Sequence, residues 1–209
     1  MTQRLKIPPT KSTLLALRRQ VTFLQQGYTL LERKRELLTR LVSVQLARYR
    51  TLRHDARASL REAYRALSVT HMRMGSRELH QATLGLGPAL QVKILPRSSL
   101  GVEYPSVAAE LLPPQPMGLM GTEASFDDTR RLLAHLAMVL ANLGEAETAL
   151  RRMLAEQRKT QKRVNSLKYN VIPRYQATIR FIQNSLEEEE RNTLFQIKLL
   201  RREDHERQH

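Results

Sequence analysis

The chain has 209 residues, a formal net charge of +15, 5% aromatic residues, no Trp and no Cys. So few aromatic side chains are unusual for a large globular core. The lack of Cys excludes a disulfide framework and thiolate chemistry. Residues 1–75 hold 16 Lys and Arg against 4 Asp and Glu, a basic stretch that attracts nucleic acid, anionic lipid or an acidic protein surface.

A first long helix is predicted to begin near Leu14, with Thr10 or Ser12 as its N-cap. Two heptad positions recur for eight repeats, and 13 of their 16 residues are apolar or aromatic. This pattern predicts one helix of about 55 to 60 residues, roughly 80 to 90 Å long, that ends at Gly75. We expect the polar seam residues to meet local polar partners, with a register-setting role as the alternative. These polar residues are Arg35, Gln45 and Ser59.

The middle of the chain has a different composition. Six of the eight Gly and six of the nine Pro lie between Gly75 and Gly121, which excludes a continuous helix. Residues 89–95 and 101–107 are predicted to form two short strands of a protruding β-hairpin, joined through residues 96–100. Pro105 would confine its strand to an edge, and residues 111–121 are expected to be a proline-rich connector.

A second long helix is predicted from Ser125, which is expected to cap it, to about residue 200. Residues 132–143 are apolar nearly all round, so this stretch is expected to pack on more than one neighbour. Further along, the apolar seam steps by one residue at Val171 and Ile172. Pro173 follows directly, and it predicts a bend without a stop.

These elements predict an elongated, all-α fold, a long antiparallel two-helix coiled coil with a small β-hairpin insertion in the middle of the chain. The expected segments are residues 1–75 for the N-terminal helix, 76–124 for the connector with the hairpin, and 125–209 for the C-terminal helix. The residues predicted to form the coiled-coil seam are Leu14, Leu17, Val21, Leu24, Leu31, Leu38, Val164, Leu167, Ile179, Ile182 and Leu186.

No catalytic, cofactor-binding or metal-binding residues are predicted, because none of the six His pairs with another at metal-ligand spacing. His135 lies in an apolar helical stretch, where a packing role is expected. Lys11-Ser12-Thr13 resembles the end of a phosphate-binding loop, but no Gly-rich stretch precedes it. Residues 187–190 are four Glu that spread around a helix, so they form an acidic collar and do not converge on one ion.

Several sequence runs carry a family resemblance. Two lie near the N-terminus: Pro9-Thr-Lys-Ser-Thr-Leu-Leu-Ala-Leu-Arg-Arg-Gln and Gly27-Tyr-Thr-Leu-Leu-Glu-Arg-Lys-Arg-Glu-Leu-Leu. Towards the C-terminus follow Arg163-Val-Asn-Ser-Leu, Val171-Ile-Pro-Arg, Gln176-Ala-Thr-Ile-Arg-Phe-Ile-Gln, the acidic run up to Arg191, and Leu194-Phe-Gln-Ile-Lys. In order and spacing these runs resemble the two ends of the D subunit of V-type (archaeal and bacterial A/V-type) ATPases.

The resemblance implies a non-catalytic central rotor shaft, or central stalk, which couples ATP hydrolysis or synthesis in the A/B hexamer to proton or sodium translocation by rotation. The implied partners are the A and B subunits of the V-type ATPase, its small F subunit and the funnel subunit that connects to the membrane ring, with one copy of this chain per complex. No nucleic acid, no cofactor and no direct membrane insertion are expected, and the location is cytoplasmic, peripheral to the membrane. The residues expected to face the hexamer are Lys11, Arg18, Arg19, Arg180, Arg191 and Lys198.

Two alternatives from other classes stay open. A basic coiled-coil nucleic-acid binder would show steeply salt-dependent DNA binding, although the sparse aromatic residues of the helices offer no stacking platform. A scaffold protein would associate with itself through the apolar residues 132–143.

Overall fold

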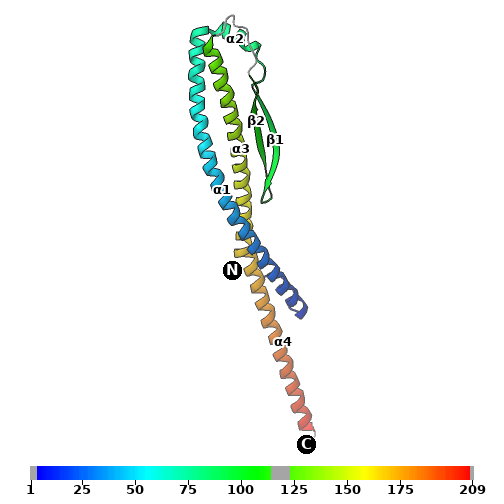
Figure 1. Ribbon diagram of the computed structural model, residues 1–209. Coiled ribbons are helices and arrows are strands. Elements are labelled where there is room, and N and C mark those ends of the chain that lie inside the picture. Colours follow the sequence, from blue (N-terminus) through cyan, green and yellow to red (C-terminus); the bar gives the residue numbers. More distant parts are fainter. Residues whose placement is uncertain (1–3, 114–122, 208–209) are drawn as a thin grey trace. The chain divides into compact units, whose positions relative to one another are not determined.

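The computed structural model describes residues 4–113 and 123–207, and these contain long helices and one β-hairpin. Residues 114–121 of the expected proline-rich connector lie outside the described residues. The contacts divide the chain into two units. Unit 1 contains Met1–Glu36 and Arg158–His209, and unit 2 contains Leu37–Gln157. The all-α fold class with a hairpin in the middle of the chain is confirmed (Figure 1).

Helix α1 spans Lys11–Met74 and is somewhat longer than its heptad pattern predicts. Thr10 caps it, because its Oγ1 accepts a hydrogen bond from the Thr13 N–H, while the Thr10 N–H donates to the Thr13 Oγ1 in return, both at 3.2 Å. Gly75 ends the helix as predicted, with a φ of 78° that favours glycine. A short helix that the sequence reasoning missed, α2 (Ser76–Leu84), follows directly.

In unit 2, α1 pairs with the first part of helix α3, which spans Ala124–Ser166 and begins one residue before Ser125. The Ser125 hydroxyl donates to the side chain of Glu123, so it does not cap the helix as expected. The direction of the pairing follows from the contacts along the two helices. Thr39, Arg48 and Thr70 of α1 contact, in that order, Gln157, Glu145 and Thr129 of α3. The partner number falls as the α1 number rises, so the two helices are antiparallel (Figure 1).

The apolar core of unit 2 joins both helices and the hairpin. Leu38 of α1, Met153 of α3 and Val102 of the hairpin are buried against each other. Towards the far end of α1, the buried hydroxyl of Thr70 lies 2.8 Å from the hydroxyl of Thr129 and 2.8 Å from the Ser125 carbonyl oxygen. At this point of the seam the two helices therefore meet through hydroxyl groups.

The hairpin consists of β1 (Leu90–Ser99) and β2 (Val102–Leu111), which pair antiparallel. The strands are longer than predicted, because the expected connecting residues 96–99 belong to β1. Leu100 and Gly101 form the turn, with φ angles of 51° and 76°. Positive φ at both central residues is the type I′ geometry, which matches the twist of the two strands.

The hairpin does not protrude from the helices as predicted. Val102 is buried in the helical core, the backbone N–H of Val107 donates to the Glu145 carboxylate of α3, and Arg152 of α3 donates to the Glu103 carbonyl oxygen. β2 therefore lies along α3 (Figure 1). These polar contacts join residues 38 and 49 positions apart in the sequence, so no local pattern signals them.

In unit 1, the N-terminal part of α1 pairs with helix α4 (Ile172–Arg207) and with the end of α3. Arg35 donates to the Gln161 side chain at 3.1 Å, and Lys11 forms an ion pair with Glu190 at 2.8 Å, so this pairing is also antiparallel. Arg35 also pairs with Glu32, which confirms the local polar partners expected for this seam residue.

One turn of π-helix, η1 (Leu167–Val171), joins α3 to α4. The N–H of Ile172 donates to the Leu167 carbonyl oxygen five residues back, so the turn holds one residue more than an α-helical turn. This extra residue accounts for the one-residue step in the seam. Pro173, which has no backbone N–H to donate, follows one residue after the turn. The predicted passage through the proline without a stop is confirmed.

The segment before α1 folds along α4, although the sequence indicates only an irregular start. The Leu5 N–H donates to the buried hydroxyl of Thr178 at 3.1 Å, and the Arg4 guanidinium lies 4.6 Å from the ring centre of Phe181. A hydrogen bond to a buried hydroxyl and a cation–π contact hold this segment in place.

Candidate partner-binding site

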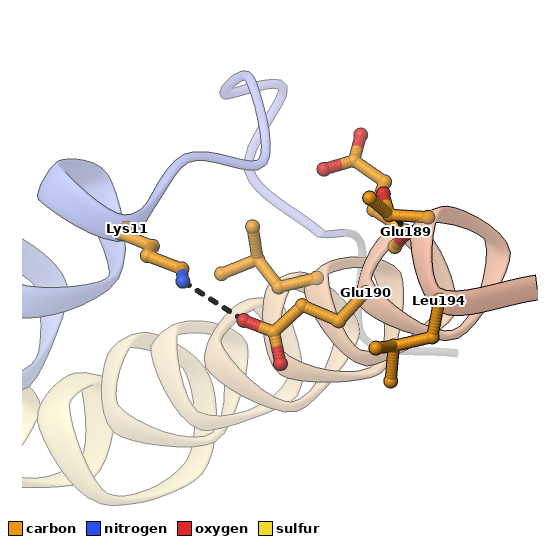
Figure 2. Close-up of a pocket in the computed structure, with 6 residues that line it drawn as sticks. Lys11, Glu189, Glu190 and Leu194 are labelled. Atoms are coloured by element: carbon orange, nitrogen blue, oxygen red, sulfur yellow. Dashed lines mark hydrogen bonds and ion pairs between the residues drawn. The ribbon is translucent and has the colours of Figure 1, made fainter. Parts of the chain in front are cut away.

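The beginning of α1 and the second half of α4 form a cleft in unit 1. The N-cap at Thr10 places Lys11 in the first turn of α1, from which its ammonium group reaches Glu190 (Figure 2). The hydrogen bond to Glu190 and then its negative charge raise the pKa of Lys11, and the same contacts lower the pKa of Glu190. Both groups are exposed, so the pair directs the two side chains more than it stabilises the fold.

The cleft has a volume of about 480 Å³ and a lining of mixed apolar, hydroxyl and charged side chains. Its lining residues are Lys11, Leu186, Glu189, Glu190, Thr193 and Leu194. The Glu189 carboxylate points away from the Lys11–Glu190 pair (Figure 2). Carboxylates that diverge in this way do not form an acid–base pair.

The acidic collar at residues 187–190 uses its carboxylates separately. Glu187 contacts Arg191 at 3.7 Å one turn along α4, while Glu190 contacts Lys11. Within residues 4–113 and 123–207, no three His, Cys, Asp or Glu side chains lie close enough together to hold a metal ion. The arrangement offers charge for contact with a partner.

The six basic residues predicted to face a partner are not buried. Lys11 and Arg191 are engaged with glutamates of α4, as described above. In the part of the chain that the structure describes, Arg18, Arg19 and Lys198 form no ion pair, and neither does Arg180. The eleven predicted seam residues are all buried or half-buried.

A surface that the sequence reasoning missed lies at the end of α4. Its five large apolar side chains are exposed: Leu194, Phe195, Ile197, Leu199 and Leu200. They have no counterpart on α1, because α1 begins at Lys11, which already pairs with Glu190. The signal was present in the sequence, since a second helix that continues past the start of the first must leave its last apolar residues uncovered. We call residues 194–200 the apolar end of α4.

A third heptad position on α1 carries further exposed apolar side chains, Phe23 and Leu30 in unit 1 and Leu37 and Val44 in unit 2. This position is neither of the two seam positions of the heptad. His135 is exposed, so the packing role expected for it is wrong.

Residues 13–202 match the protein family described as the D subunit of ATP synthase. The chain belongs to this family. The D subunit of the V-type ATP synthase of Thermotoga neapolitana is 31% identical over 198 residues, which are 94% of this chain and 98% of the relative. The D subunit of the A-type ATP synthase of Pyrococcus furiosus is 29% identical over 205 residues, 96% of each chain. That of Methanosphaera stadtmanae is 30% identical over 206 residues, 97% of this chain and 96% of the relative.

Membership of the D-subunit family confirms the resemblance found in the sequence and makes this chain a component of an A/V-type ATP synthase. None of the described helices combines the length and the apolar character that a membrane span needs.

Proposed function

We propose that this chain is the non-catalytic central rotor shaft of its ATP synthase, coupling ATP hydrolysis or synthesis in the A/B hexamer to proton or sodium translocation. The observation that carries the proposal is the apolar end of α4, with five large apolar side chains exposed in a chain of the D-subunit family. An exposed apolar cluster of this kind marks a protein interface. Insertion into the bore of a hexamer would cover it from all sides.

Exposed basic residues carry positive charge on both helices of unit 1. Lys11, Arg18 and Arg19 lie on α1, and Arg180, Arg191 and Lys198 lie on α4. We propose that they face acidic surfaces lining the bore. Such contacts at an exposed rim contribute to orientation and association rate more than to affinity, so they allow rotation without locking one position.

Coupling then depends on differences in contact energy. If each orientation of the shaft contacts the surrounding proteins differently, each orientation favours a different nucleotide state, and nucleotide turnover favours rotation in return. The buried seam, from Leu17 and Val21 on α1 to Val164 and Ile182 on the partner helices, keeps the helices from turning independently. No residue of this chain takes part in the chemistry.

We propose the small F subunit and the funnel subunit as partners outside the hexamer, with one copy of this chain per complex and a cytoplasmic position peripheral to the membrane. The division into residues 1–75, 76–124 and 125–209 then corresponds to two shaft helices and one connector between them.

The test is a reconstituted complex carrying Leu194→Glu and Phe195→Glu. Because well-packed interface anchors contribute about 2 kcal/mol or more each, the two changes together should weaken association with the A/B hexamer on the order of 1,000-fold. ATP-driven ion movement should fall with it. Met72→Glu, also on an exposed apolar residue but in unit 2, is the matched control and should bind normally. Equal coupling in the double variant and the control would refute the proposal.

A further inference from the structure

The two edges of the hairpin differ. On β2, the N–H of Val107 donates to Glu145 at 2.5 Å, and the Glu103 carbonyl oxygen accepts from Arg152 at 2.9 Å. These two backbone groups therefore point away from β1 and towards α3. Pro105 lies between them in the same alternating register and has no N–H to satisfy. The outer edge of β2 is thus covered by helix α3.

The outer edge of β1 follows from the same register. Ile94 lies opposite Val107, and in an antiparallel pair both members bond to each other or both point outward. Because Val107 points outward, so do the N–H and C=O groups of Ile94 and, two residues away, of Val92. Residues 91–98 of β1 are all exposed. In the described chain no other strand pairs with this edge.

Pro96 lies in this register too, opposite Pro105. Neither proline removes a bond between the strands, because neither position donates across the ladder. On the open edge, Pro96 offers an acceptor but no donor. The usable part of the edge consequently lies around Val92 and Ile94, each with one N–H and one C=O group, and extends to the Pro96 carbonyl oxygen.

The side chains of β1 carry a defined chemistry. Val92 and Ile94 share one face and are 43% and 67% exposed, while Lys93 and Arg97 lie on the other face, four residues apart. Opposite them on β2 are Ala108 and Tyr104, which supply no negative charge. Among the described residues neither Lys93 nor Arg97 forms an ion pair.

We propose that the open edge of β1 receives an extended segment of another protein, which adds a third strand and carries acidic side chains opposite Lys93 and Arg97. In such a strand the two acidic residues are four positions apart and apolar residues alternate with them, so that they cover Val92 and Ile94. A second copy of β1 is a poor occupant, because it would place like charges side by side and bring a second proline to the edge.

The full chain is tested with a nine-residue peptide of valine that carries two glutamates four positions apart, with lysine in place of both glutamates as the control peptide. The glutamate peptide should slow hydrogen exchange at the Val92 and Ile94 amides. Lys93→Glu with Arg97→Glu, both on the exposed surface, should weaken its binding roughly 2- to 30-fold, the range for two exposed charge pairs, and should favour the lysine peptide instead.

A backbone test separates strand addition from general charge attraction. Ile94→Pro removes an outward N–H at a register position that already tolerates proline, and it should abolish the protection. Ser98→Pro removes an outward N–H beyond Pro96 and should leave binding unchanged. Equal binding by the two proline variants, protection away from β1, no preference between the peptides, or self-association through β1 in sedimentation would each overturn the proposal.

Discussion

Glu145 is the residue whose removal should test the packing of the hairpin most directly. It is 9% exposed, and its two carboxylate oxygens serve different elements. One accepts from the Val107 N–H of β2, and the other contacts the Arg48 guanidinium of α1 at 3.3 Å. Replacing Glu145 by Ala leaves the Val107 N–H, at the edge of β2, without a hydrogen-bond acceptor.

The expected loss can be worked from these contacts. A hydrogen bond to a charged group contributes about 1.5–3 kcal/mol to stability. The contact with Arg48, which is half-exposed, adds about 0.2–1 kcal/mol. Glu145→Ala should therefore lower the free energy of unfolding by about 2–4 kcal/mol. Glu145→Gln keeps a neutral acceptor for the Val107 N–H and should lose about half as much.

Urea denaturation measures the loss, and hydrogen exchange at Val107 shows whether it is local to the hairpin. The control is Glu147→Ala on the same helix, which removes an exposed pair with Arg151 and should cost about 0.3–0.5 kcal/mol. If the two alanine variants unfold at the same urea concentration and Val107 exchanges at the wild-type rate in both, the carboxylate does not hold the hairpin.

Three further predictions concern the hairpin turn, the π-helical turn η1 and the exposed ion pair. Leu100→Asn should raise the free energy of unfolding by about 1 kcal/mol in thermal melts, because leucine is disfavoured at positive φ by roughly 1–2 kcal/mol and asparagine tolerates it; an unchanged or lower melting temperature contradicts this. Deleting Asn170, with the proline after η1 changed to alanine, should restore an α-helical turn and keep the helical circular dichroism and stability. Deleting the exposed Gln176 instead rotates the following seam by about 100° and should be strongly destabilising, so equal stability of the two deletions contradicts the role of η1 as the place of the extra residue. Lys11→Met should raise the pKa of Glu190 towards its ordinary value in an NMR titration, since Lys11 lowers it. The pair's contribution is present above the ordinary carboxyl pKa and is lost as pH falls through the lowered value, and an identical Glu190 titration in both proteins would show that the contact does not form.

The helices were predictable because their signals are local and repeat many times. A seam that recurs every seven residues identifies buried positions such as Leu17 and Ile182 without knowledge of the partner helix. Gly75 marks the end of α1 through its positive φ, and Thr10 marks the start through a hydroxyl that accepts from the Thr13 N–H. The one-residue step beside Pro173 indicated a local irregularity, although the pattern does not distinguish a π-helical turn from a kink.

The packing of the hairpin was not predictable in the same way. Val102 contacts Leu38 and Met153 across long stretches of sequence, and a single valine in a strand gives no sign of which helix covers it. The alternation of the strands likewise left open which edge meets α3, because this depends on the position of Glu145. The proposed hexamer-facing residues stay predictions, since exposure alone does not distinguish a solvated arginine from one that meets a partner.

The hydroxyls of Thr70 and Thr129 have a consequence for how α1 and α3 respond to load. Apolar contacts have no fixed direction, so after a shift by one heptad the apolar side chains of the seam could still pack against other apolar side chains. The same shift would break the hydrogen bonds that the Thr70 hydroxyl makes to α3, and would leave it only the Ala66 carbonyl oxygen of its own helix. Sliding of α1 along α3 in unit 2 is therefore opposed by directional contacts at Thr70, together with those of Arg48 and Thr39, and axial displacement from this alignment is penalised.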